Sequence, residues 1–203
     1  MEFLKFLVSI LAIADPVFAA ILVSGLVSSV KEIKKVAFKS SLTFLIASLI
    51  TLFFGDSFLS LLGVNIFSIK IFGGLILLHM AFQMLQASPP RTKHTDREDS
   101  AVSEKEDISI IPVGIPILFG PGVFTTLLIF KEEIVGFSDL FQLLLAIFLS
   151  SLVIFLFLMN ASWFSKRLGE TGIGVTVRIF GLFVGALGSQ FIVEGVKHLW
   201  IQG

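Results

Sequence analysis

Two proline residues interrupt apolar stretches that are long enough to cross a lipid bilayer. Pro16 follows Asp15 within the apolar run 6–30, and Pro121 stands between two glycines within the run 108–130. A proline inside a helix leaves polar backbone groups unpaired, and lipid cannot satisfy them. These groups must face protein, water or a ligand. Interruptions at corresponding places in two halves of a chain indicate the binding site of a secondary transporter.

The apolar runs predict an all-α membrane protein. Hydrophobic residues make up 55% of the 203 residues, and charged residues make up 15%. About 20 apolar residues suffice to span the hydrocarbon core of a bilayer. The runs of this length are 6–30, 40–69, 71–90, 108–130, 140–165 and 171–193. We therefore expect six transmembrane helices, of which the first and fourth are discontinuous.

Two markers recur at nearly one spacing, which predicts an internal duplication. The motif Lys70-Ile71-Phe72-Gly73 returns as Arg178-Ile179-Phe180-Gly181, 108 positions later, and the two interrupting prolines are 105 positions apart. Three helices per half is an odd number, so the two halves must have opposite orientations in the membrane. We expect two inverted three-helix repeats, residues 1–86 and 108–203, joined by a polar linker at 87–107.

The distribution of positive charge predicts the orientation. The connections after the first, third and fifth spans hold eleven lysines and arginines, whereas the opposite side holds four, namely Lys5, Lys70, Lys131 and Lys197. The positive-inside rule places the larger group in the cytoplasm, together with the linker 87–107. Both termini are then expected outside.

The dipeptide Asp15-Pro16 can restart a helix within the first span. Aspartate is favoured at the N-cap, and proline is favoured at the first helical position. Asp15 is about 15 Å into its span, near the bilayer centre, where an unpaired carboxylate is costly. The carboxylate could therefore serve only as a cap, or it could also bind a proton, a cation or a substrate ammonium group.

The tripeptide Gly120-Pro121-Gly122 repeats this arrangement without a charge. The N–H groups near Gly122 and Val123 would point out of a half-helix N-terminus, which suits an anion. Thr125 and Thr126 follow within one turn and could add hydroxyl donors. A kinked helix packed on its neighbours is the alternative.

A carboxylate at one interruption and backbone donors at the other match a zwitterionic solute. The predicted solute contacts are Asp15, Pro16, Gly120, Pro121, Gly122, Val123, Thr125 and Thr126.

Three further polar residues lie within predicted spans. His79 and Gln83 share one face of the third span, and Gln190 lies in the sixth. Polar residues within a membrane usually face the bundle interior, so we expect these three to line it. Hydrogen bonding between helices is the expected role. A proton relay through His79 is the alternative.

The sequence carries no signature of an enzyme, a metal site or a cofactor. It has no Gly-x-Ser-x-Gly, no His-Glu-x-x-His, no Walker loop and no cysteine. The formal net charge of zero gives no indication of nucleic acid binding. We therefore expect a protein that is not an enzyme and has no metal or cofactor.

Several of these segments resemble the MarC family of small integral membrane proteins. The matching segments are Ala14-Asp15-Pro16, Ile71-Phe72-Gly73-Gly74, the segment 111–122, and Arg178-Ile179-Phe180-Gly181-Leu182 with Gln190 and Gly195. The resemblance implies six spans, inverted repeats and a location in the plasma (inner) membrane. Some members are described as transporters of small neutral amino acids such as glycine and alanine. Members usually continue Asp-Pro-x-Gly-Asn-x-Pro, whereas this chain has Phe18, Ala19 and Ile21, which makes its first interruption less polar.

We therefore expect a secondary transporter of a small neutral solute, in the class of glycine or alanine, that works by alternating access. Asp15 and His79 are the candidates for coupling to a proton or sodium ion. The expected partners are the lipid bilayer and the solute, and a homo-oligomer is left open. Two alternatives remain. One is a non-transporting membrane scaffold or accessory protein. The other is an intramembrane enzyme, which needs Asp15 and His79 within hydrogen-bond reach.

Overall fold

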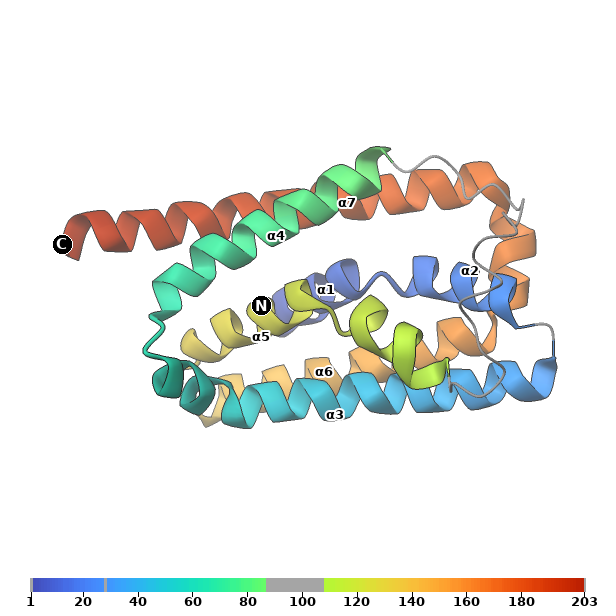
Figure 1. The fold of residues 1–203 in the computed structure, drawn as a ribbon, viewed down its shortest axis with the longest axis horizontal. Coiled ribbons are helices and arrows are strands. Elements are labelled where there is room, and N and C mark those ends of the chain that lie inside the picture. Colours follow the sequence, from blue (N-terminus) through green and yellow to red (C-terminus); the bar gives the residue numbers. More distant parts are fainter. Residues whose placement is uncertain (1, 28, 87–107, 203) are drawn as a thin grey trace.

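The chain is almost entirely helical in the residues that the computed structural model describes, which are 2–27, 29–86 and 108–202, and short turns separate the helices. The linker predicted at 87–107 lies outside these residues. The elements, shown in Figure 1, are α1 (Glu2–Ala14), α2 (Pro16–Leu26), α3 (Val30–Leu62), α4 (Ile66–Gln86), the kinked segment η1 (Ser109–Leu118), in which Ile111 and Ile115 are extended, α5 (Pro121–Glu132), α6 (Phe137–Met159) and α7 (Ala161–Gln202).

Five helical segments in the described ranges are long and apolar enough to cross a membrane. They are Glu2–Leu26, Val30–Leu62, Ile66–Gln86, Phe137–Met159 and Thr171–Trp200. The segments η1 and α5 make a sixth span if the pair, bent by 55°, counts as one. The chain is therefore a multi-pass helical membrane protein, as the apolar runs predicted. Helices α2 and α5 both begin at the interrupting prolines, so both predicted discontinuities are present.

The predicted spans differ from the helices at several boundaries, because the apolar runs do not coincide with the helices. Helix α3 ends at Leu62 instead of residue 69, and α4 begins at Ile66 instead of residue 71. Helix α3 begins at Val30, ten residues before its apolar run, since the lysine-rich segment 31–39 is also helical. Lysine is a good helix former, and it is hydrated at the end of a span. Helix α6 ends at Met159 instead of continuing to residue 165. The chain then enters the first part of α7, which crosses the end of the bundle and bends at Gly169, where φ is 61° (Figure 1).

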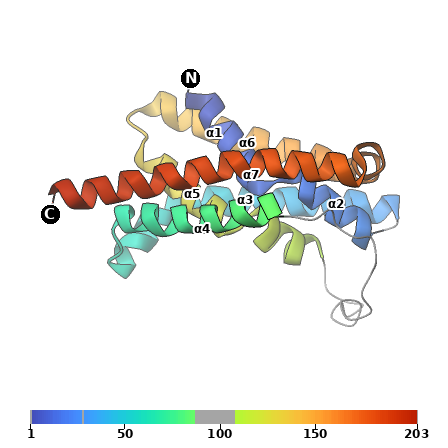
Figure 2. The same cartoon turned by 90° about the horizontal axis from the view of Figure 1, so that it is seen from above.

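The helices form antiparallel pairs that combine the first and second halves of the chain. Helix α3 runs opposite to α6, and α4 runs opposite to α7 (Figures 1 and 2). The pair α4–α7 is held by glycines, because a Cβ atom built on Gly74 would lie 2.5 Å from the carbonyl oxygen of Gly188. Gly181 approaches the backbone of Ala81 in the same way. Small residues let two helix backbones approach closely in a membrane.

Each interrupted helix packs against the long helix of the other half. Helices α1 and α2 contact α6, whereas η1 and α5 contact α3. The N–H group of Phe3 donates to Oε1 of Gln142 at 3.0 Å, and Oγ of Ser40 donates to the carbonyl oxygen of Ser109 at 2.7 Å. Because both interrupted helices are enclosed in this way, their breaks lie inside the bundle.

Candidate functional site

The first interruption is built around Asp15. Its backbone is left-handed, with φ 41° and ψ 68°, a conformation that aspartate tolerates better than most residues. Its Oδ1 accepts a hydrogen bond from the N–H of Phe18 at 3.1 Å, so the carboxylate caps α2 as predicted. The Asp15 N–H still donates to Leu11, and its carbonyl accepts from Ala19. The break therefore removes few backbone hydrogen bonds, and the side chain of Asp15 is what caps the new helix start.

The carboxylate of Asp15 is enclosed. The residue is 8% exposed, and Ala14, Val17 and Ala19 beside it are also buried. Within the described residues, no lysine, arginine or histidine lies within ion-pair distance of this carboxylate. The pairing of Asp15 with His79 that an intramembrane enzyme would need is therefore not formed. A buried carboxylate with a single cap is costly unless it binds a further partner.

The second interruption is formed by backbone alone. Gly120 is extended, with φ −97° and ψ 179°, and its carbonyl accepts from the N–H of Phe124 at 3.1 Å. A Cβ atom at Gly120 would lie 2.7 Å from the carbonyl oxygen of Pro116, so this turn needs glycine. No side chain caps α5. The N–H groups of its first turn, at Gly122 and Val123, are those that a helix N-terminus leaves for other partners.

The two interruptions meet at Gly122. A Cβ atom built there would lie 3.0 Å from Cγ2 of Ile13, 2.9 Å from Cδ2 of Leu77 and 3.0 Å from Sδ of Met80. Ile13 is two residues before Asp15, so the end of α1 touches the start of α5. The space that we expected a solute to occupy beside Gly122 is filled by these three side chains. The two helix breaks are therefore in contact, and the packing between them leaves no opening at Gly122.

The two threonines of α5 have different surroundings. Thr125 packs against Gly73 of α4, where its methyl group takes the place of a side chain. Thr126 is fully buried, and its Oγ1 has no hydrogen-bond partner among the described residues. Thr126 shares a helix face with Gly122 and Phe130, both of which contact α1. A buried hydroxyl without a protein partner costs free energy, so Thr126 can offer a hydrogen bond to a molecule that reaches the break.

Two serines that we did not predict add to this group. The Oγ atoms of Ser48 and Ser150 are buried and unpartnered among the described residues. Ser48 follows Phe44 by one turn of α3, and the Phe44 ring contacts that of Phe119 at the second interruption, with centroids 6.3 Å apart. Ser150 lies on the face of α6 that contacts α1 through Gln142. Unsatisfied hydroxyls therefore flank both broken helices.

Three polar residues predicted to line the bundle lie on its outside, so this prediction is wrong. His79 and Gln83 are exposed, with 2.9 Å between Nε2 of His79 and Nε2 of Gln83. Gln190 is exposed and donates to Glu194 at 2.8 Å. The inward face of α4 is set by its small and aliphatic residues, namely Gly73, Gly74, Leu77 and Ala81. His79 and Gln83 lie on the other side of the helix.

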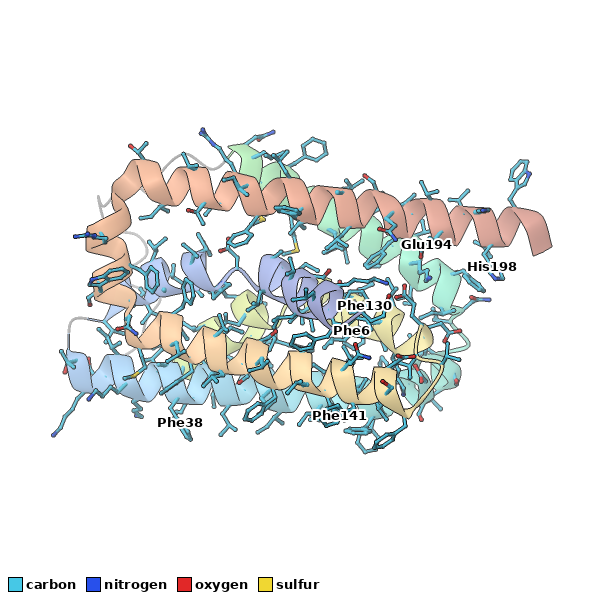
Figure 3. All side chains as sticks on the ribbon, turned by 180° about the vertical axis from the view of Figure 1, so that it is seen from behind. Phe6, Phe38, Phe130, Phe141, Glu194 and His198 are labelled. Carbon is cyan, nitrogen blue, oxygen red and sulfur yellow. The ribbon has the colours of Figure 1, made fainter. Side chains whose placement is uncertain are left out.

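Three ion pairs join the two halves near the N-terminal end of the bundle. Lys5 bonds to Glu133 at 2.5 Å and Lys70 bonds to Glu194 at 2.9 Å. The third pair joins Lys131 to Asp56 at 2.6 Å. Next to the first pair, the rings of Phe6 and Phe130 are 4.9 Å apart (Figure 3). Charge pairing and aromatic contact therefore join the two halves at this end of the bundle.

The described residues contain no cluster of three or more His, Asp or Glu side chains that could hold a metal ion. The functional groups at the breaks are one carboxylate, backbone N–H groups and hydroxyls. Such groups can bind a small polar solute through hydrogen bonds and one charge.

The comparisons with known proteins agree on one family. The sequence model described as "MarC family integral membrane protein" matches residues 1–200. A UPF0056 membrane protein of Aquifex aeolicus is 32% identical over 199 residues, which cover 97% of this chain and 93% of the relative. The UPF0056 membrane proteins YhcE of Escherichia coli and BU267 of Buchnera aphidicola are each 30% identical over 200 residues, covering 98% of this chain and 93% of each relative. No solved structure matches the chain significantly.

Proposed function

The chain belongs to the MarC family of integral membrane proteins, and from this premise we propose that it is a secondary transporter of a small neutral solute. The observation that carries the proposal is the contact between Ile13 and Gly122, which brings the two interrupted helices together. The carboxylate of Asp15 would receive an ammonium group or a coupling ion. The first turn of α5 would receive a carboxylate. A small amino acid such as glycine or alanine fits both.

Inverted repeats are part of this proposal. They are supported by a correspondence between α3 and α6. The buried residues of the two helices recur at one constant offset in the sequence. The seven buried residues of α6 each stand 110 positions after one of the first seven buried residues of α3. The segment Phe38-Lys39-Ser40-Ser41-Leu42 returns as Phe148-Leu149-Ser150-Ser151-Leu152. Two antiparallel helices with one burial pattern are what a duplicated, inverted unit produces.

Transport would require the two halves to move relative to each other. In the structure the N-terminal end is closed by the three ion pairs, each of which joins one half to the other. Opening this end breaks all three pairs together, so they favour the closed state. The unpartnered hydroxyls of Thr126 and Ser48 would hydrogen-bond the solute or water once the path is hydrated.

The orientation and coupling extend the proposal. The excess of lysine and arginine on the connections after the first, third and fifth spans supports a cytoplasmic location for these loops and outer termini. A bacterial inner membrane is the corresponding location. A proton or a sodium ion bound at Asp15 would link solute movement to an ion gradient.

The tight packing at the breaks favours a second candidate, a non-transporting membrane scaffold. Asp15 is 8% exposed and already caps α2, and Gly122 is covered by three side chains. In a scaffold both interruptions would be structural only. The two candidates differ in whether the centre ever opens.

Uptake of radiolabelled glycine and alanine into proteoliposomes tests the proposal. We expect saturable uptake that exceeds that of protein-free liposomes and that rises with an imposed proton or sodium gradient. The same solutes should raise the thermal unfolding temperature of the purified protein. Absence of both uptake and stabilisation across a panel of neutral amino acids would reject the transporter and leave the scaffold.

A further inference from the structure

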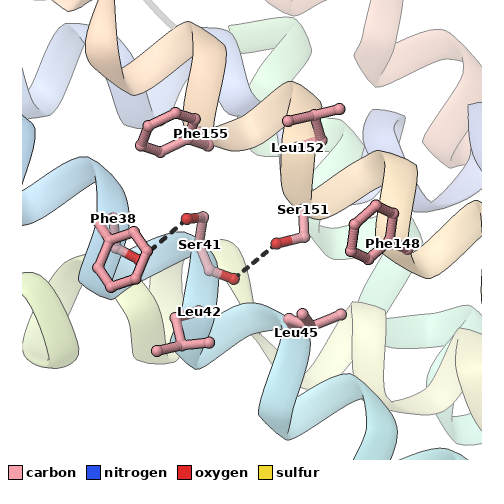
Figure 4. A pocket seen from close by; sticks show the side chains of 8 residues that line it. All are labelled: Phe38, Ser41, Leu42, Leu45, Phe148, Ser151, Leu152 and Phe155. Carbon is pink, nitrogen blue, oxygen red and sulfur yellow. Dashed lines mark hydrogen bonds between the residues drawn. The ribbon is translucent and has the colours of Figure 1, made fainter.

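A groove of about 260 Å³ runs between α3 and α6 on the outer surface of the bundle (Figure 4). Each helix contributes four residues, mostly aromatic and aliphatic. Phe38 and Leu42 on α3 are 59% and 40% exposed, and Phe148 and Leu152 on α6 are 57% and 43% exposed. Neither Asp15 nor Gly122 lines the groove. Its rim faces the lipid that surrounds a multi-pass membrane protein.

The floor of the groove offers no free polar group. Its two polar residues are Ser41 and Ser151, and both hydroxyls donate to backbone carbonyls. Ser41 donates to Phe38 at 3.0 Å, and Ser151 donates to Ser41 at 2.9 Å (Figure 4). An occupant therefore gains from apolar contact and finds no unsatisfied hydrogen-bonding group. A hydrocarbon chain suits such a surface, whereas a polar solute does not.

One end of the groove is positively charged. Lys34 and Lys31 precede Phe38 by one and two helical turns, so they lie on the same face of α3, and both are exposed. The corresponding residues of α6, 110 positions later, are Leu144 and Phe141, and neither is charged. Because the charge is confined to one end, a molecule with an anionic head and an apolar tail can bind in only one direction.

The dimensions match one leaflet of a bilayer. From Lys34 to Leu45, where the lining of α3 ends, the helix rises about 16 Å, which is close to half of the ~30 Å hydrocarbon core. Trp163, just beyond the end of α6, is 58% exposed at the same end of the bundle as the lysines. Tryptophan is enriched where the membrane meets water, and this is the level of the lipid headgroup.

We propose that this groove binds an anionic phospholipid of the surrounding bilayer. One acyl chain lies between α3 and α6, and the phosphate of the headgroup pairs with Lys31 and Lys34. The site is separate from the helix interruptions and does not depend on the transport proposal.

Native mass spectrometry of the detergent-purified protein tests the site with dioleoyl-phosphatidylglycerol and dioleoyl-phosphatidylcholine. Two lysines near a headgroup correspond to a roughly 30-fold tighter Kd for the anionic lipid. The double variant Lys31→Gln/Lys34→Gln should bind both lipids with equal Kd. Leu42→Trp fills the groove and should weaken the binding of both lipids by about tenfold or more.

Two control variants distinguish this site from general lipid contact. Lys197→Gln removes an exposed lysine of α7, and Ile50→Trp adds bulk at a position of α3 that is 55% exposed and outside the groove. Both should retain the wild-type affinities. Equal Kd values for the two lipids in the wild type would overturn the proposal. It would be overturned equally if Lys197→Gln or Ile50→Trp reproduced the loss, since the lipid would then be annular only.

Discussion

Ile13, in the last turn of α1, packs against Gly122, in the first turn of α5, so closely that a Cβ atom on Gly122 would lie 3.0 Å from Cγ2 of Ile13. The two residues belong to different halves of the chain and adjoin the two helix interruptions. Their contact explains how two distant prolines contribute to one place in the bundle. It also shows that this place is closed in the present conformation.

Gly122→Ala should force the two interruptions apart. The added methyl group would press on the ends of the Ile13, Leu77 and Met80 side chains, which can shift, so we expect a cost at the low end of overpacking, about 1 kcal/mol. We expect a lower free energy of unfolding in detergent. Gly25→Ala in α2 is the matched control, because nothing lies within 4 Å of its Cβ position. Equal stability of the two variants would show that the contact can relax without cost.

The pair α4–α7 should be more sensitive than the interruptions. A Cβ atom on Gly188 would meet the carbonyl oxygen of Gly74 at 2.8 Å, and a backbone atom cannot move aside as a side chain can. We expect Gly188→Ala to lower the unfolding free energy by about 2–3 kcal/mol or more. Gly174→Ala on the same helix has nothing within 4 Å and should be neutral or stabilising, because alanine is the better helix former. Thermal unfolding of both variants in one detergent measures the difference.

The ion pairs at the N-terminal end should differ in strength according to burial. The side chain of Lys70 is 11% exposed, whereas that of Lys5 is 36% exposed. Glu194→Gln leaves a nearly buried lysine without its counter-charge, which we expect to cost about 2–3 kcal/mol. Glu133→Gln leaves a lysine that water can reach and should cost about 1 kcal/mol or less. Chemical denaturation of each variant checks this order, and the reverse order would contradict it.

Thr126→Val should separate stability from transport. Valine has the shape of threonine without the hydroxyl, and Thr126 Oγ1 is buried without a partner among the described residues. The substitution should therefore be neutral or stabilise the protein by up to about 1 kcal/mol. If the hydroxyl binds the solute or its water, uptake should fall at the same time. A stable variant with unchanged uptake would remove Thr126 from the site.

The sequence predicted the interruptions correctly because proline acts locally. A proline has no N–H, and aspartate or glycine before it favours a helix start, so Pro16 and Pro121 needed no knowledge of packing. The helical class and most of the spans followed from apolar length alone. Of the two unpartnered serines, Ser150 had a signal in the recurrence of Phe-x-Ser-Ser-Leu at Phe38 and Phe148, whereas Ser48 lies outside that repeat.

The inward face of a helix could not be predicted in the same way. His79 and Gln83 were expected inside because polar groups avoid lipid, yet Gly73 and Gly74 decide which face of α4 meets α5 and α7. Close backbone contact outweighed polarity, and His79 and Gln83 hydrogen-bond to each other instead. The acidic partners of Lys5 and Lys70 were missed because they are more than 120 positions away in sequence. Such pairings depend on tertiary structure.

Asp15→Asn should retain the fold and lose the function. Asparagine is as good an N-cap as aspartate and tolerates the left-handed backbone, so the unfolding free energy should change by less than about 1 kcal/mol. Asp15→Ala lacks both properties and should lose about 1–2 kcal/mol. Thermal unfolding of the two variants separates the capping role from the charge.

Glycine and alanine uptake by the wild type and by Asp15→Asn, reconstituted at equal density with an imposed proton or sodium gradient, tests the central claim most directly. Gradient-driven uptake in the wild type and background uptake in a fully folded Asp15→Asn variant is the predicted result. Equal gradient-driven uptake by the two proteins would contradict the role of Asp15 at the junction of the two broken helices.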